Sequence, residues 1–458
     1  MALLDDSAKQ AQATVEQKFL FRKIGLPFDY ASNPDDFPSR AFATAKEARS
    51  GLPNPLGLGG GYHYSCRNHA LLFDSYLLRI ELGIEAQGDE AILDRLIGGL
   101  IRLATVAPKS FLVGGLSPDG RGFYARPLRE NHAAWAFAVT RGLSTPAISP
   151  ESQDKFRSIA GKWMDRAKRE KFRLLGMDGK NPSVCDLSQP EADNGPFLLA
   201  MLLTAARASG DDKDHEAYVQ AAEENARVRL DAFLPHEIQE DVQILLWRQA
   251  ALAIVAEHDP EPERAALARK RMHENAQTAA RRIVAWRDWD SSMLDIEVDL
   301  EWRKCPKVPL DENPLGFTPP ESWARLEKEK VLEEALSAMY VMLLAGDAEF
   351  LEPHVAEMEE CLATLPWKSL VSLNSIAPAI GVHARGVELG LWDKTLYESC
   401  RETPSSEVSF SAKYMEPDYD DENPEKAGHN EEPPGKRKAE PQGKGEGGGR
   451  KRRRRRRK

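Results

Sequence analysis

The 458-residue chain lacks any apolar run approaching the ~20 residues that a transmembrane helix needs. Its N-terminus, MALLDDSAKQAQATVEQ, is polar and acidic, with no basic segment followed by an apolar one, so we expect no secretory signal. Cysteine is rare, and the odd number and wide spacing favour reduced thiols in a cytoplasmic protein over a disulfide framework. The five cysteines form no CxxC motif: Cys66, Cys185, Cys305, Cys361 and Cys400.

Motifs of common catalytic and nucleotide-binding sites are also missing. The segment HEIQED at 236–241 is not the HExxH of a zinc protease, and GLGGG at 57–61 lacks the GK[ST] of a phosphate-binding loop. There is no GxSxG, and no cysteine stands beside a plausible histidine partner. We therefore expect no metal site and no cofactor, and the motifs do not support a nucleophilic hydrolase.

Strand signals are scarce, whereas helix signals are abundant and of two kinds. One kind is apolar almost all round, which is typical of buried helices. Six segments belong to it: NHALLFDSYLLRIEL at 68–82, AAWAFAVTRGL at 133–143, NGPFLLAMLLTAA at 194–206, VQILLWRQAALAIVA at 242–256, EALSAMYVMLLAG at 334–346 and SIAPAIGVHARGVELGLW at 375–392. The other kind is apolar on one side, which is typical of surface helices, as in the stripes Val219, Ala222, Ala226, Leu230, Phe233; Met272, Ala276, Ala279, Ile283, Trp286; and Leu351, Val355, Met358, Leu362, Leu365.

The two kinds of helix alternate along the chain. Five buried segments are each followed by a one-sided one, and the N-terminal KQAQATVEQKFLFRKIG, with Val15, Phe19 and Leu20 on one face, supplies a partner for the sixth. Six inner and six outer helices predict an all-α (α/α)6 toroid, a closed double ring over residues 1–402. An open α-solenoid is the alternative. The irregular repeat length and the lack of a consensus repeat favour the ring.

The connections between these helices are unequal in length. Inner-to-outer links are short turns at 87–90, 209–212 and 345–348, in which a Gly ends one helix and an Asp caps the next. Outer-to-inner links at 105–130, 172–193 and 289–331 far exceed the ~2–8 residues usual between packed helices. In a ring of hairpins these long links share one end, so we expect the functional face there.

Three stretches carry a resemblance to a known family: GGYHYSCRNHALLFDSYLLR, LVGGLSPDGRGFYARPLRENHAAW and PSVCDLSQPEADNGPFLLAMLLTAARASGD. Over roughly residues 50–395 the chain resembles the six-hairpin glycosidase-like superfamily, especially its uncharacterised bacterial toroid proteins. In those proteins a Gly-x-x-Pro-Asp-Gly loop precedes a carboxylate-polar-aromatic motif that opens the second inner helix. The resemblance implies acid/base carboxylates at the mouth of the ring, as in unsaturated uronyl hydrolases and other glycan hydrolases and lyases. Here the carboxylate is Glu130, where an aspartate is more usual.

Candidate site residues lie at the predicted mouth. Glu130 opens the second inner helix and Asp193 precedes the third, so the two carboxylates are candidates for general acid and base. Ordinary helix capping is the alternative interpretation of both. Rings that stack on sugars and guanidinium groups that pair with anions are candidates for substrate binding: His63, Tyr64, Arg67, Arg121, Tyr124, Arg126 and Arg129. Packing and salt bridges within an acidic protein are the alternative for these. Trp286, Trp289 and Trp302 flank the longest link and are candidates for a sugar platform or for anchors of that loop.

These residues support two functional hypotheses. The first is a cytoplasmic carbohydrate-active enzyme, a hydrolase or lyase acting on an anionic or unsaturated oligosaccharide. The second is a non-catalytic toroid that binds a glycan or a partner and carries a basic tail.

The C-terminal segment has a different composition from the rest. Residues 403–458 are rich in Pro, Glu, Gly, Lys and Arg and poor in aliphatic residues, which predicts disorder. The segment is first acidic and then basic. Residues 436–458 carry 13 basic and 2 acidic residues, a net charge of +11, which leaves −21 on the remainder of the chain. Nonspecific contact with nucleic acid or another polyanion through Lys436–Lys458 follows from this charge, although the segment has no aromatic residue to stack on bases.

Removal of the basic segment is expected to weaken retention on nucleic acid. A chain that ends before Pro434 should elute from immobilised DNA at a lower salt concentration than the full chain, because the released counterions set the salt dependence. Equal elution of both chains would show that the body, rather than this segment, carries any polyanion contact.

Overall fold

The computed structural model describes residues 2–21, 25–29, 65–85, 88–117, 120, 122–124, 129–171, 173, 175, 187, 194–229, 242–295, 302–309, 311–313 and 317–392. The described part is predominantly helical, as predicted. Within it, no helix combines the length and hydropathy needed to cross a bilayer. The predicted tail at 403–458 lies outside the described residues.

The α-helices are α1 (Ala2–Lys18), α3 (Ser65–Leu82), α4 (Asp89–Thr105), α5 (Arg129–Leu143), α6 (Pro150–Arg169), α7 (Asn194–Ser209), α8 (Asp212–Arg229), α9 (Val242–His258), α10 (Pro262–Ala279), α11 (Ala324–Ala345), α12 (Ala348–Leu351), α13 (Val355–Thr364) and α14 (Ala377–Glu388). The 3-10 helices are η1 (Pro108–Ser110), η3 (Ile283–Asp288), η4 (Ser291–Asp295), η5 (Trp302–Lys304), η6 (Glu321–Trp323), η7 (Glu352–His354), η8 (Trp367–Ser369) and η9 (Leu373–Ser375). Two antiparallel pairs of short strands complete the described part: β1 (Leu20–Phe21) with β2 (Leu26–Pro27), and β3 (Gly115–Leu116) with β4 (Phe123–Tyr124).

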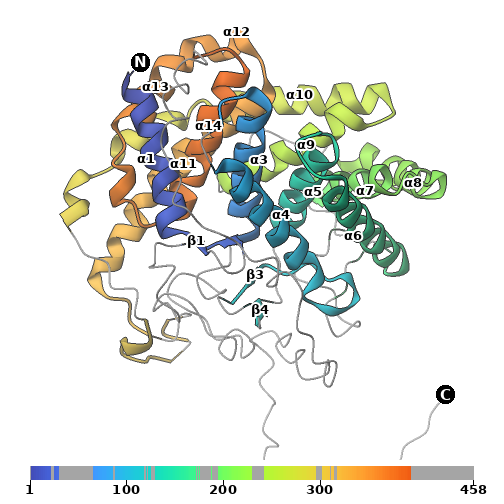
Figure 1. Cartoon of the computed structure of the whole chain (residues 1–458), viewed down its shortest axis with the longest axis horizontal. Coiled ribbons are helices and arrows are strands. Elements are labelled where there is room, and N and C mark those ends of the chain that lie inside the picture. Colours follow the sequence, from blue (N-terminus) through green and yellow to red (C-terminus); the bar gives the residue numbers. More distant parts are fainter. Residues whose placement is uncertain are drawn as a thin grey trace, which may run out of the picture.

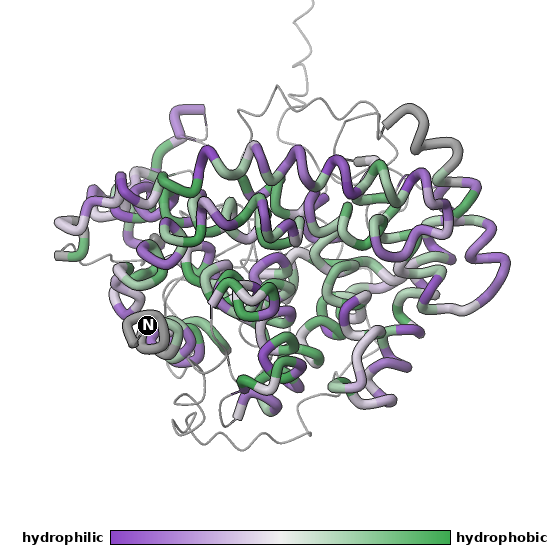
Figure 2. Tube along the Cα trace, turned by 90° about the horizontal axis from the view of Figure 1, so that it is seen from above, coloured by the Kyte–Doolittle hydropathy of each residue, from purple (hydrophilic) through white to green (hydrophobic). Residues whose placement is uncertain are grey.

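Burial separates the two predicted kinds of helix. Every residue of α3 from Ser65 to Arg79 is buried, whereas α10 buries a stripe that includes Met272, Ala276 and Ala279 and exposes its other side. Hydrophilic stretches accordingly gather at the outer edge of the molecule (Figure 2). The distinction between all-round and one-sided hydrophobicity therefore predicted correctly which helices form the core.

The six buried helices contact one another in a cyclic order. α3 packs on α5, α5 on α7, α7 on α9, α9 on α11, α11 on α14, and α14 returns to α3. We call these six the inner helices. α4 packs on α3, α8 on α7 and α10 on α9, while α1 packs on α14 and α13, where the sequence predicted the partner of the last inner helix (Figure 1).

Side-chain hydrogen bonds indicate that the inner helices they join run in the same direction. Asn68 near the start of α3 bonds to Asn374 just before α14 at 2.7 Å, and the Thr140 and Thr204 hydroxyls join the later parts of α5 and α7 at 2.7 Å. In Figure 1, β1, β3 and β4, which precede α3 and α5, lie at the lower end of the molecule, and α12, which follows α11, lies at the upper end. We call the end at which α3, α5 and α14 begin the start end.

The predicted turns are confirmed at two of the three sites. Gly346 ends α11 in the left-handed region (φ 68°) and Asp347 then accepts the amide of Phe350, while Gly210 (φ 63°) follows α7. At 87–90 the prediction is wrong in detail, because Gly88 (φ 100°) precedes α4 and Asp89 does not cap it. The Asp89 carboxylate is fully buried and pairs with Arg79 at 3.0 Å instead.

The described part of the predicted loop at 105–130 contains a β-hairpin. Its strands β3 and β4 pair Gly115 with Tyr124, and the Ser117 hydroxyl accepts the amide of Gly122 at 2.8 Å. Gly120 takes a left-handed conformation (φ 68°) in the turn, which favours glycine at this position. The residues SPDG at 117–120 are typical of a turn and could be recognised in the sequence. The two strands beside them are too short to give a detectable alternation of polar and apolar residues.

One buried carboxylate connects four inner helices. Asp74 of α3 accepts Arg141 of α5 at 3.0 Å, Arg385 of α14 at 2.7 and 2.8 Å, and the Tyr340 hydroxyl of α11 at 2.5 Å. Burial alone would raise the pKa of Asp74, but the charges of Arg385 and Arg141 outweigh it and lower that pKa. Asp74 is therefore an ionised acceptor inside the core.

Replacement of Asp74 is expected to destabilise the fold strongly. Asp74→Asn removes the fully buried counter-charge that Arg385 and Arg141 share and should lower the free energy of unfolding by about 3–5 kcal/mol, measured by chemical denaturation. Glu388→Gln is the matched control, because Glu388 pairs with the same Arg385 at 2.8 Å from a partly exposed position and should cost less than about 1 kcal/mol. Equal losses in both variants would contradict a central role for Asp74.

Candidate functional site

Four of the predicted site residues fall within the described part of the chain: Glu130, Arg67, Tyr124 and Arg129. The others lie outside the described residues: Asp193, His63, Tyr64, Arg121 and Arg126. The predicted pairing of Glu130 with Asp193 therefore stays a prediction.

Glu130 and Asn131 lie in the first turn of α5, at the start end. A carboxylate is favourable there because the helix N-terminus carries partial positive charge. Both residues are buried, with 5% and 0% of their surface exposed. Neither amide atom of Asn131 has a hydrogen-bond partner among the described residues. A fully buried carboxamide without partners is uncommon in folded proteins, because its desolvation is not compensated.

The start of α3 lies beside this turn. The Cys66 thiol donates to the Asn131 carbonyl oxygen at 3.5 Å. Burial raises the pKa of Cys66 to about 12, so this cysteine is a neutral thiol rather than a nucleophile. The next residue, Arg67, is also buried. The predicted substrate-binding Arg67 and the predicted catalytic Glu130 are thus brought to adjacent helix starts.

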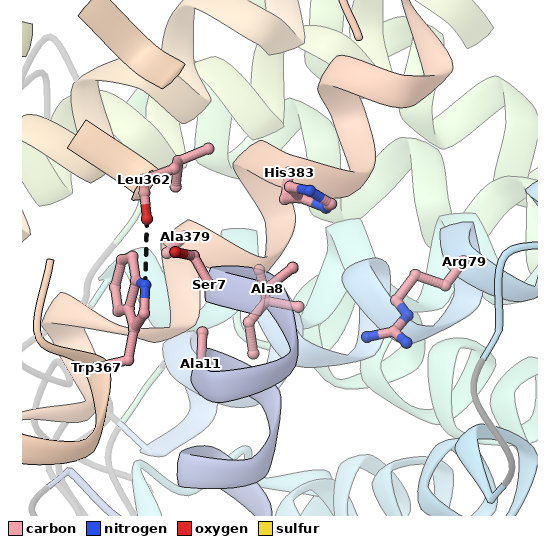
Figure 3. A pocket seen from close by; sticks show the side chains of 9 residues that line it. Ser7, Ala8, Ala11, Arg79, Leu362, Trp367, Ala379 and His383 are labelled. Carbon is pink, nitrogen blue, oxygen red and sulfur yellow. Dashed lines mark hydrogen bonds between the residues drawn. The ribbon is translucent and has the colours of Figure 1, made fainter. Parts of the chain in front are cut away.

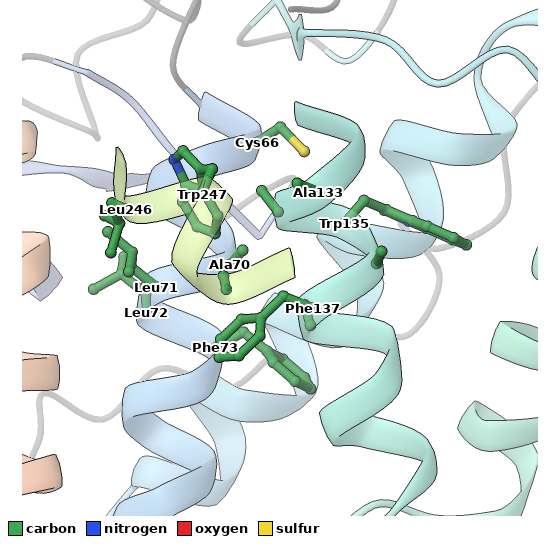
Figure 4. Packing of buried hydrophobic residues seen from close by; sticks show 14 of the residues in the cluster. Cys66, Ala70, Leu71, Leu72, Phe73, Ala133, Trp135, Phe137, Leu246 and Trp247 are labelled. Atoms are coloured by element: carbon green, nitrogen blue, oxygen red, sulfur yellow. The ribbon is translucent and has the colours of Figure 1, made fainter. Parts of the chain in front are cut away.

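An indole from a third inner helix lies in the same region. Trp247 of α9, which packs on α5, is fully buried. In Figure 4 its ring is seen near Cys66 and Ala133, close to the first turns of α3 and α5. Its Nε1–H has no acceptor among the described residues. The hydrophobic periodicity places Trp247 in a buried segment, but periodicity cannot indicate that a donor will lack an acceptor.

A second polar cluster lies on the other side of the α3 start. The Asn68 amide donates to Asn374 at 2.7 Å and to the Asp29 carboxylate at 3.4 Å, and the Leu373 amide donates to the Asp29 carbonyl oxygen at 2.8 Å. Asp29 is fully buried. The sequence gives no sign of this buried carboxylate, because its partners lie 39 and 344 positions away in the chain and no local pattern links them.

A third carboxylate, Glu329 of α11, is buried close to this cluster. It accepts the amides of Val371 at 3.1 and 3.2 Å and of Ser372 at 2.9 Å. Burial raises the pKa of Glu329 to about 7, against the opposing effect of these hydrogen bonds and of Arg325. A sequence signal existed, because Glu329 lies on the same helical stripe as Leu332 and Leu336, on the side that the structure buries.

Two aromatic candidates have structural partners. Tyr124 on β4 is 9% exposed and packs within the hydrophobic core. The Trp286 indole donates to Glu357 at 2.7 Å and lies under the Arg287 guanidinium, 5.3 Å from the ring centre. These contacts favour the interpretation of Trp286 as a loop anchor. Arg129 at the first position of α5 is half-buried.

A small pocket lies elsewhere, between α1, α3, α13 and α14. It is lined by mostly apolar side chains together with Ser7, Arg79 and His383 (Figure 3). Arg79 lies in the last turn of α3, and none of the predicted site residues lines this pocket. The pocket is therefore separate from the cluster around Glu130.

No protein-family model matches this sequence, and no curated protein matches it. The resemblance to six-hairpin glycosidase-like proteins stays a prediction.

Replacement of Asn131 by an apolar residue is expected to leave stability unchanged or to increase it. Asn131→Leu removes two unpaired buried polar atoms and should raise the free energy of unfolding by about 1 kcal/mol, measured by urea denaturation. Thr140→Val is the contrasting control, because it removes the hydrogen bond between the Thr140 and Thr204 hydroxyls. It should lower that free energy by about 1 kcal/mol. A clear loss of stability in Asn131→Leu would mean that the amide has a structural role.

Proposed function

We propose that the chain is an (α/α)6 toroid that cleaves an anionic or unsaturated oligosaccharide at the start end of its inner helices. The cleavage proceeds by hydrolysis or by β-elimination. The cyclic contact order of six inner helices supports the toroid. The motifs around Glu130 that resemble six-hairpin glycosidase-like proteins support the substrate class. The single observation that carries the proposal is the buried Glu130 beside the unpaired amide of Asn131.

The unpaired polar atoms near the first turns of α3 and α5 suit a sugar. A hydroxyl group both donates and accepts hydrogen bonds, and a carboxamide offers one acceptor and two donor hydrogens. Asn131 supplies such a carboxamide, and Trp247 supplies a further donor and an apolar ring. A ligand that satisfied these atoms would recover the desolvation cost that the protein alone bears.

The chemistry assigned to Glu130 is proton transfer. Glycoside cleavage uses two carboxyl groups, about 5–5.5 Å apart for retention and about 6.5–9.5 Å apart for inversion. Asp193 is the partner that the sequence indicates. In hydrolysis Glu130 protonates the glycosidic oxygen, or the double bond of an unsaturated sugar, while its partner removes a proton from the attacking water. In elimination the partner instead removes the proton next to the uronate carboxyl, the bond from the sugar carbon to the glycosidic oxygen breaks, and Glu130 protonates that leaving oxygen.

The arginines near the start end are the reason for proposing an anionic substrate. Planar guanidinium groups pair with carboxylates through two parallel hydrogen bonds. Arg67 is buried at the start of α3 and Arg129 is half-buried at the start of α5. The predicted link at 105–130 contains two more positively charged residues, Arg121 and Arg126.

A non-catalytic toroid that binds a glycan or a partner, with polyanion contact through the basic tail, is the second candidate. The unpaired amide of Asn131 favours it as much as it favours catalysis, because binding alone satisfies that amide. A measurement of substrate turnover distinguishes the enzyme from the non-catalytic binding protein.

The test is a screen of oligosaccharides, including unsaturated uronides, with purified full-length chain. Glu130→Gln should lower kcat by about 10²–10⁴-fold with little change in KM, since general acid–base catalysis contributes this much. Asp193→Asn should lower kcat similarly if Asp193 is the partner. Glu90→Gln is the matched control, an exposed glutamate in the first turn of the outer helix α4, and should have no effect.

Each outcome of the screen decides between the candidates. Turnover that survives Glu130→Gln would overturn the assignment of Glu130. Saturable binding without turnover, lost in Asn131→Leu, would establish the non-catalytic candidate. Neither turnover nor binding across the screen would remove the carbohydrate proposal.

A further inference from the structure

Asn131 differs from the other buried carboxamides of the inner helices. Asn68 of α3 and Gln243 and Gln249 of α9 are buried as well, and the amide nitrogen of each donates to an oxygen of a neighbouring element at 2.7–3.1 Å. Among the described residues, Asn131 is the one buried carboxamide whose oxygen and nitrogen both lack a partner. The core thus provides partners for its other buried amides, but not at the start of α5.

The backbone fixes the position of this carboxamide. Asn131 lies in the first turn of α5, which packs on α3 and α9. Its carbonyl oxygen accepts the Cys66 thiol at 3.5 Å, so the main chain of this turn is also joined to the start of α3. A group on a packed helix is positioned more accurately for a ligand than a group on a loop.

Trp247 adds an unpaired donor from α9. Its fully buried ring lies near the first turns of α3 and α5, and in Figure 4 the indole nitrogen is at the upper edge of the ring, on the side where α3 begins. The Nε1–H has no acceptor among the described residues, whereas the Trp135 indole of α5 donates to the Leu100 carbonyl oxygen at 3.4 Å. Trp163 and Trp289 also lack an acceptor there, but neither belongs to an inner helix.

These unpaired atoms restrict the chemical group that can satisfy them. A carboxamide presents an acceptor oxygen and a donor nitrogen side by side, and the indole adds one donor. A carboxylate or a sulfate ester offers acceptors alone, so the Asn131 oxygen would stay unpaired. The N–H and C=O of an acetamido group point in opposite directions across its trans amide bond, so one carboxamide cannot pair with both.

Two hydroxyl groups on neighbouring sugar carbons meet the requirement. One hydroxyl donates to the carboxamide oxygen, the other accepts from the carboxamide nitrogen, and a remaining lone pair accepts the indole N–H. A substituent on the donating hydroxyl removes its hydrogen. On either oxygen, a substituent also adds bulk beside side chains that are fully buried.

We propose that Asn131 and Trp247 form a specificity subsite that binds an unsubstituted vicinal diol of the sugar next to Glu130. The subsite rests on the proposed function, because it takes the ligand to be a saccharide. It goes further by stating which feature of the saccharide is recognised. Because Asn131 follows Glu130 in the first turn of α5, the diol belongs to a sugar at the cleaved bond.

Blocking the diol without changing the charge of the ligand tests the subsite. The probes are oligogalacturonates and unsaturated uronide disaccharides, each with free hydroxyls at C2 and C3 and as the 2,3-di-O-methyl derivative. Binding is measured by calorimetry with the full-length Glu130→Gln chain, so that the probe is not consumed. The methylated form should bind about tenfold to a hundredfold more weakly than the free form, because hydrogen bonds in a buried site are lost.

Substitutions in the same background locate the effect. Asn131→Leu should bind the free and methylated forms within about twofold of each other, because neither form can then use the carboxamide. Trp247→Phe keeps an aromatic ring and removes the donor, so it should weaken binding of the free form by about fivefold to tenfold. Trp135→Phe is the matched control, because its indole N–H already has a partner in the protein, and both affinities should be unchanged.

The outcomes separate this subsite from the proposed function. Equal binding of free and methylated probes, or a preference for the free form that survives in both Asn131→Leu and Trp247→Phe, would overturn the subsite alone. Binding of 2′-deoxyadenosine 5′-monophosphate that is lost in Asn131→Leu would assign the carboxamide to a base edge instead, since adenine also presents an adjacent donor and acceptor but this nucleotide has no vicinal diol. Failure of every free saccharide to bind would remove the proposed function and the subsite together.

Discussion

The buried charge of Asp74 is the constraint on which the arrangement of the inner helices depends. A carboxylate inside a core is stable only when partners replace the water that it loses. Here the partners come from α5, α11 and α14, and their positions along those helices are fixed by the reach of Arg141, Tyr340 and Arg385. Apolar packing between helices tolerates sliding and rotation, whereas this set of bonds has one geometry.

Because these bonds fix the positions of the inner helices, they determine which residues come together at the start end. Because α3, α5 and α14 run in the same direction, their first turns lie at one level, and the polar residues of those turns become neighbours. Asn68 and Asn374 find each other and Asp29, so that cluster has hydrogen bonds within the protein. Asn131 and Trp247 keep unpaired polar atoms among the described residues. This asymmetry between two sides of one helix start is the reason for assigning ligand contact to the side of Glu130.

Two kinds of buried carboxylate are present, with opposite electrostatics. Asp74 has cationic partners that outweigh burial and lower its pKa, whereas Glu329 has mainly backbone amides, burial dominates, and its pKa is raised. The first suits a permanent structural charge.

The sequence by itself determined the all-α class, which helices are buried, most turns and the pairs α3–α4, α7–α8 and α9–α10, because hydrophobic periodicity and capping are local properties. It did not determine that α6 packs mainly on α7 rather than on α5. It also indicated Glu130 and Arg67, because both lie at the predicted starts of buried segments. Tertiary structure alone decided the partners of Asp74, the cluster of Asp29 with Asn68 and Asn374, and the burial of Glu329. These contacts join residues up to 344 positions apart, and no local pattern encodes which distant group will satisfy a buried polar group.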